Sequence, residues 1–100
     1  MLAFWKSDEF RSAVEQIVSG FLKFRYNQEL KGVVRFKDAY TAKVITVYTD
    51  HDDSKIQLVD YILDLEYVED NANGPIRIRI YECEYPEFGV KGVYIGTVEF

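Results

Sequence analysis

Apolar residues in the first third of the chain recur at the spacing of an α-helix. Ser7 is a suitable N-cap, and two acids follow it in the expected first turn. Lys31 and then Gly32 supply the base and the glycine that are typical of a helix C-terminus. We therefore predict one long helix over residues 8–31. Its core-facing stripe advances by four, three, four and three residues and consists of Phe10, Val14, Ile17, Phe21 and Phe24, flanked by Ala13 and Val18.

Gly20 is the weak point of this helix, because glycine inside a helix costs about 1 kcal/mol relative to alanine. An alternative interpretation ends the helix at Gly20 and treats residues 21–26 as a strand, since apolar residues there alternate with Lys23 and Arg25. We favour the long helix. The aromatic residues Phe4 and Trp5 precede it, and we expect them to fold back onto the core.

Beyond Gly32 the apolar pattern changes to alternation, which is the period of a β-strand. The predicted strands cover residues 33–36, 40–49, 56–68, 76–85 and 90–100, separated by turns at 37–38, 50–54, 71–75 and 86–89. A helix through 56–68 is an alternative, because some of its apolar residues also fit helical spacing. The whole pattern predicts a single α+β domain over residues 1–100, with one long N-terminal helix packed on a four- to five-stranded antiparallel meander sheet.

Three details inside these strands carry further predictions. In residues 56–68 the apolar side chains alternate with Asp60, Asp64 and Glu66, which indicates one buried and one polar face. The apolar phase inverts after Ile80, which suggests a bulge or bend. Gly96 in the last strand leaves room for a large side chain or for the helix to approach.

The charge of the chain is concentrated in its middle. The net charge is −5, yet residues 50–70 alone hold eight acids against Lys55, a net of −7, whereas residues 1–49 carry a net of +3. Such a stretch repels nucleic acid and membrane surfaces and favours a basic partner. The eight acids are Asp50, Asp52, Asp53, Asp60, Asp64, Glu66, Glu69 and Asp70.

The single cysteine, Cys83, cannot form an intramolecular disulfide, which fits a reducing compartment. The N-terminal residues lack the basic and long apolar segments of a signal peptide, and no stretch reaches the length of a membrane span. We therefore expect a cytoplasmic protein.

Catalytic and metal-binding motifs are sparse. The segment Asp50-His51-Asp52-Asp53 surrounds the only histidine with carboxylates, but an EF-hand loop would need glycine and glutamate where the chain has Lys55 and Tyr61. Zinc would need three or four His or Cys ligands, and the chain has one of each. The glycines form neither GxGxxG nor a P-loop. We expect no metal, no cofactor and no enzymatic activity.

Residues 16–20, Gln-Ile-Val-Ser-Gly, match the Q-x-V-x-G pattern of cystatins, and a helix with an antiparallel sheet resembles the cystatin fold. In cystatins that motif lies in a hairpin loop after the helix, whereas here it falls inside the predicted helix. The Pro-Trp of the second cystatin hairpin loop is absent, because the only tryptophan is Trp5. We interpret the match as a coincidence of sequence.

The leading functional hypothesis is a small, non-enzymatic binding module that blocks a partner through residues 50–70. Carboxylates at alternate positions of one strand lie about 6.6–6.8 Å apart and imitate a phosphate backbone. Acidic phage inhibitors of host nucleases and bacterial immunity proteins work in this manner, which is an analogy of charge and size. The expected partner is a basic protein, such as a nuclease or another nucleic-acid-binding complex, contacted by the eight acids and Tyr48.

Two other hypotheses stay open from the sequence. The aromatic excess suits a small-ligand-binding or enzymatic domain with a pocket between helix and sheet. The last strand, residues 90–100, carries few charges that would protect an edge, which suits self-association as a homodimer rather than a monomer.

Overall fold

The computed structural model describes residues 4–27, 29–49, 55–56, 61–68, 76–83 and 92–99. A short 3-10 helix, η1 (Phe4–Lys6), leads into the single α-helix α1 (Asp8–Tyr26). The strands that follow are β1 (Leu30–Phe36), β2 (Thr41–Thr49), β3 (Lys55–Ile56), β4 (Tyr61–Val68), β5 (Arg77–Cys83) and β6 (Val93–Glu99). The predicted turns at 50–54, 71–75 and 86–89 lie outside the described residues.

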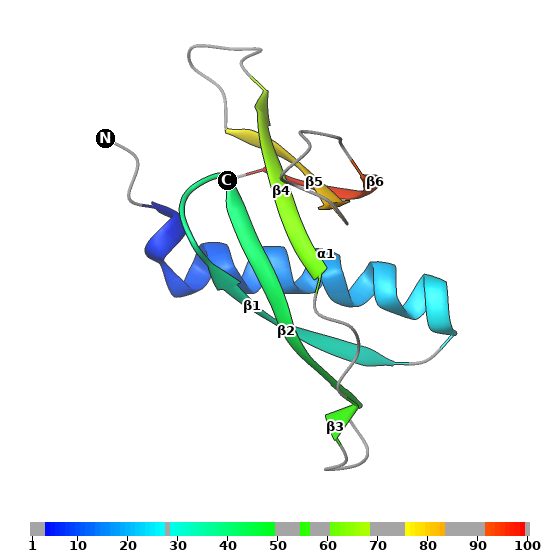
Figure 1. The fold of residues 1–100 in the computed structure, drawn as a ribbon. Coiled ribbons are helices and arrows are strands. Elements are labelled where there is room, and N and C mark those ends of the chain that lie inside the picture. Colours follow the sequence, from blue (N-terminus) through cyan, green and yellow to red (C-terminus); the bar gives the residue numbers. More distant parts are fainter. Residues whose placement is uncertain are drawn as a thin grey trace.

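The strands form one antiparallel sheet that α1 crosses on one face (Figure 1). Its order is β1-β2-β4-β5-β6, and the two-residue β3 also pairs with β2. The predicted meander with one N-terminal helix is therefore confirmed, and residues 61–68 are a strand rather than a helix. The helix contacts β1 and β6, the two outer strands, so the sheet curves around it.

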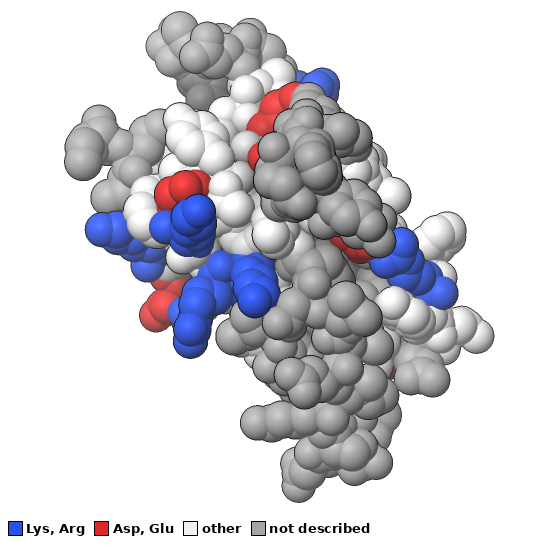
Figure 2. All heavy atoms as spheres, in the orientation of Figure 1, with Lys and Arg blue, Asp and Glu red and all other residues white. Residues whose placement is uncertain are grey.

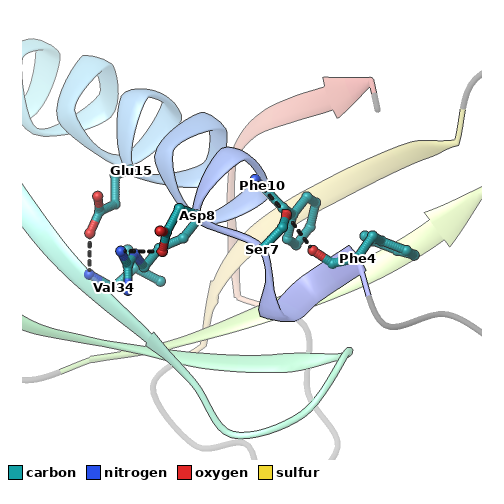
Figure 3. Close-up of polar contacts among 7 residues, drawn as sticks. Phe4, Ser7, Asp8, Phe10, Glu15 and Val34 are labelled. Carbon is teal, nitrogen blue, oxygen red and sulfur yellow. Dashed lines mark hydrogen bonds and ion pairs between the residues drawn. The ribbon is translucent and has the colours of Figure 1, made fainter.

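The start of α1 follows the prediction. Ser7 lies just outside the helix with extended backbone angles, and its Oγ accepts a hydrogen bond from the Phe10 N–H at 3.1 Å. The same hydroxyl donates to the Phe4 carbonyl at 2.7 Å and so ties η1 to α1 (Figure 3). Phe4 and Trp5 pack against the core, as the sequence predicted.

The predicted end of the helix at residue 31 is wrong, because α1 ends at Tyr26. Asn27 adopts a left-handed conformation (φ 54°) and donates its N–H to the Lys23 carbonyl at 2.8 Å, which closes the last turn. Gly32 lies instead in β1, where a Cβ atom would come within 2.8 Å of Val18 Cγ1. Gly32 therefore serves close packing between strand and helix. Residues 21–26 are helical, so the long-helix interpretation holds across Gly20.

The buried stripe of α1 is rotated relative to the prediction. Phe10, Val14, Val18 and Leu22 have no exposed surface, whereas Ile17 and Phe21 are half-buried and Phe24 is 86% exposed. The rotation follows from the sheet, since Val18 and Leu22 fit over Gly32 of β1. Within the described residues, these helix side chains and the inward residues of the sheet fill the space between α1 and the sheet, where Leu63, Ile78 and Ile80 are fully buried.

The prediction for Gly96 is confirmed. A Cβ atom at this position would lie 2.4 Å from Ile17 Cγ2, so glycine lets α1 approach β6 closely. The register between β5 and β6 shifts between Ile80 and Tyr81, at the position where the sequence suggested a bulge.

Candidate partner-binding surface

The two faces of β4 separate acids from the core. Leu63 and Leu65 are buried toward α1, and the intervening Asp64 and Glu66 lie on the opposite, helix-free face with partial exposure. β4 is the middle strand of the five-strand order, so these two acids lie at the centre of the helix-free face. The predicted polar face of this segment is thus confirmed for both residues.

Arginines on the neighbouring strand cancel part of this charge. Arg79 is the register partner of Glu66 and binds it, with 3.2 Å between Nη1 and Oε1. Arg79 and Glu66 therefore form a cross-strand ion pair between β5 and β4. Arg77 is placed differently, because it lies opposite Val68 on β4 and binds Glu99 of β6 at 3.3 Å.

Asp64 has different neighbours. Its register partners are Thr41 on β2 and Tyr81 on β5, both uncharged. Among residues with a described placement, Asp64 forms no ion pair, while Glu66 is bound to Arg79. Asp64 is therefore the acid of β4 whose charge remains most available to a partner.

The structure describes the other predicted contact residues only in part. Tyr48 lies in β2 opposite Lys31 of β1 and Lys55 of β3, and its side chain is outside the described part. The structure brings Asp64 and Glu66 together on one strand face. The remaining predicted contact residues lie outside the described residues, namely Asp50, Asp52, Asp53, Asp60, Glu69 and Asp70.

Glu82 has a role that the sequence did not indicate. Glu82 pairs with the inward-facing Leu63 and so lies on the helix side of the sheet. There it accepts two hydrogen bonds from Arg25 Nη1, at 2.9 and 3.0 Å. These bonds raise the pKa of Arg25 and tie the last turn of α1 to β5.

An apolar groove runs between α1 and β6. It has a volume of about 430 Å³, and its walls include Ile17, Gly20 and Phe24 from the helix and Tyr94 and Ile95 from the strand. Phe24 is 86% exposed, and Val93 and Tyr94 are each 52% exposed. Sequence periodicity assigned Phe24 to the core and therefore missed this groove.

The opposite flank of α1 is polar. Glu15 reaches from the helix to β1 and accepts a hydrogen bond from the Val34 N–H at 2.9 Å (Figure 3). Val34 follows the register shift between β1 and β2, where an edge N–H needs an acceptor. Glu15, Ser12, Ser19 and Lys31 line a groove of about 440 Å³ on this side.

The described residues include no group of three or more side chains able to hold a metal ion, and Asp50 to Asp53 lie outside them. No described helix is both long and apolar enough to cross a membrane. The Q-x-V-x-G residues lie inside α1 rather than in a hairpin loop. Comparison with protein-family models, with curated proteins and with solved structures gave no match to this chain.

Proposed function

We propose that this protein is a non-enzymatic binding module whose acidic stretch, residues 50–70, blocks a basic surface of a partner protein. The observation that carries the proposal is the net charge of −7 within these residues. The position of Asp64 and Glu66 at the centre of the helix-free face supports it, because a sheet holds alternate side chains at a fixed pitch of about 6.6–6.8 Å.

The proposed mechanism is competition with nucleic acid. A rigid row of carboxylates presents the charge of a phosphate backbone to a groove lined with Lys and Arg. A nuclease or another nucleic-acid-binding protein is the partner class that this chemistry fits. Since Arg79 already binds Glu66, Asp64 supplies most of the negative charge that β4 offers to a partner. The rest of the contact would come from the other acids of residues 50–70.

The direct test is charge reversal with a matched control. Asp60, Asp64 and Glu66 are replaced by Lys in one variant, and the exposed Glu9, Glu29 and Glu99 are replaced by Lys in the other. Both variants change the net charge equally, so general charge effects cancel. We expect the wild type and the second variant to recover the partner from source-cell lysate, and the first variant to fail to recover it. Equal recovery by both variants, once circular dichroism shows both folded, would exclude the acidic stretch as the contact surface.

Salt gives a second readout once the partner is in hand. The Debye length falls from about 10 Å at 0.1 M to about 3 Å at 1 M, so charge-steered association slows. We expect the partner on-rate to fall at least several-fold, while the melting temperature holds or rises because repulsion among the acids is relieved. An on-rate that does not change with salt concentration would indicate an apolar interface.

A second candidate, self-association through β6, is favoured by the exposure of Val93 and Tyr94 on that edge strand. Residues 93–98 carry no charge, so two copies can pair antiparallel without placing like charges opposite each other. Light scattering at high concentration should then detect a dimer that Val93→Lys abolishes, with Lys6→Glu as a surface control. A monomer at all concentrations excludes this candidate.

A further inference from the structure

The two carboxylates on the helix-free face of β4 have different neighbours on β5. Glu66 lies opposite Arg79, and their side chains form an ion pair of 3.2 Å. Asp64, two residues earlier on the same face, lies opposite Tyr81 instead. Figure 1 shows β2 and β4 in front of α1, and Figure 2, in the same orientation, shows acidic side chains beside a basic one where the upper part of β4 lies. The chain thus places an arginine opposite one carboxylate and a tyrosine opposite the other.

The Asp64 carboxylate is left without a polar partner. It forms no hydrogen bond or ion pair with any described residue, although Asp64 is half-buried in the middle strand of the sheet. A half-buried carboxylate loses part of its hydration, and this loss is unfavourable unless another polar or charged group replaces the lost water. A cation from outside the chain would provide that contact.

Two aromatic rings lie beside Asp64 on the same face. Tyr81 is its register partner, and Tyr94 of β6 is the register partner of Tyr81, so the three side chains form one row across β4, β5 and β6. The two rings meet edge to face with their centroids 5.7 Å apart. The hydroxyl of Tyr94 shares a hydrogen bond with that of Thr97, and Tyr94 is 52% exposed. The row therefore joins a carboxylate to an oriented aromatic surface at the edge of the sheet.

We propose that the row of Asp64, Tyr81 and Tyr94 binds an arginine side chain of the basic partner protein. This inference rests on the proposed function and names the contact by which the partner is recognised. A guanidinium group has the charge and the paired donors that a carboxylate binds, and its plane packs on aromatic rings. Strands β6 and β4 are two strand spacings apart, about 10 Å, so an arginine that enters over Tyr94 can reach Asp64. Within the chain, Arg79 makes the corresponding contact with Glu66.

The row should prefer arginine to lysine. A lysine ammonium is a compact and strongly hydrated charge, which neither pairs with both oxygens of a carboxylate nor stacks flat on a ring. An acidic surface that acts by charge alone would bind the two side chains equally, because each carries one positive charge. The preference between the two cations therefore separates this contact from general attraction to the acidic stretch.

The test compares two extended peptides that differ only in their cations, one of alternating Arg and Gly and one of alternating Lys and Gly. Each peptide is titrated into the protein at low ionic strength and followed by NMR and calorimetry. We expect the arginine peptide to bind several-fold more tightly, with its δ-methylene protons shifted upfield by the tyrosine rings. Asp64→Asn should weaken binding of the arginine peptide roughly tenfold, the loss of one charge-assisted contact.

Variants of Tyr94 test the aromatic part of the contact. Tyr94→Leu should remove the preference for arginine and the upfield shift, while binding of the lysine peptide stays the same. Tyr94→Phe keeps the ring and should retain both. Glu9→Gln is the matched control for Asp64→Asn, because it removes one negative charge from the exposed first turn of α1 and should bind both peptides as the wild type does. Thermal melts establish that every variant is folded.

The outcomes for the peptides and for the partner separate the two proposals. Equal affinity of the wild type for both peptides, or a preference for arginine that survives both Asp64→Asn and Tyr94→Leu, overturns the arginine contact. Either result leaves the proposed function in place, provided that replacing Asp60, Asp64 and Glu66 by Lys still abolishes partner recovery. If that replacement leaves recovery unchanged, the proposed function fails, and the assignment of the row to this partner fails with it.

Discussion

The two outer strands of the sheet both lie against α1, but they contact the helix in different ways. The contact with β1 is a hydrogen bond, since Glu15 accepts the Val34 N–H at 2.9 Å and polar residues surround the contact. The contact with β6 is close apolar packing, since Ile17 lies over Gly96, where a Cβ atom would come within 2.4 Å. One helix thus has a polar flank and an apolar flank.

The two kinds of contact leave different surfaces beside the two edge strands. A hydrogen bond to a carboxylate satisfies the backbone of β1 locally and leaves hydrophilic surface around it. Close packing at β6 needs no polar group, but it does not cover the Phe24 side chain further along the helix, which is 86% exposed. An apolar flank of this kind is the surface on which a partner strand or helix gains most from burial.

The largest expected effect comes from adding one methyl group at each edge. Gly96→Ala places a Cβ 2.4 Å from Ile17 Cγ2, and Gly32→Ala places one 2.8 Å from Val18 Cγ1. Overpacking costs about 1–3 kcal/mol, and we expect Gly96→Ala to lie near the upper end and Gly32→Ala near the lower. Urea unfolding measures both.

A rescue experiment tests the cause of the Gly96 effect. Ile17→Ala removes the atom that the new Cβ would meet, so Gly96→Ala should cost less in that background than in the wild type. If the two costs are equal, the loss arises from the backbone of β6 rather than from contact with α1.

A smaller effect is expected at the polar edge. Glu15→Ala leaves the part-buried Val34 N–H without its acceptor and should lower the free energy of unfolding by about 1–2 kcal/mol. Glu15→Gln keeps an oxygen in place and should cost less. The exposed neighbour Gln16→Ala serves as the control and should change little. Faster amide hydrogen exchange at Val34 in Glu15→Ala would locate the effect, and unchanged exchange would contradict it.

The smallest effect has the opposite sign. Gly20 is exposed on the apolar flank, and an added Cβ meets no atom of the surrounding elements within 4 Å. Gly20→Ala should therefore raise the free energy of unfolding by about 0.5–1 kcal/mol through helix propensity alone. Thermal unfolding should show a higher melting temperature, and a lower one would mean that the glycine has a structural task on this flank.

The sequence by itself determined the order and type of the longer elements, whereas η1 and the division of the predicted strand 56–68 into β3 and β4 were not predicted. Ser7 as N-cap and the alternation around Asp64 and Glu66 both follow from local stereochemistry, which depends on neighbours along the chain. The concentration of acids in residues 50–70 was equally visible, because charge is additive along a sequence.

Only the tertiary structure decided how these elements meet. Helical periodicity predicted Phe24 in the core stripe. Its exposure follows from the rotation of α1 that packs Val18 and Leu22 against Gly32. The contacts of Glu15 with β1 and of Arg25 with Glu82 join residues 19 and 57 positions apart. Periodicity fixes which side of an element is apolar but not which neighbour its polar side will face.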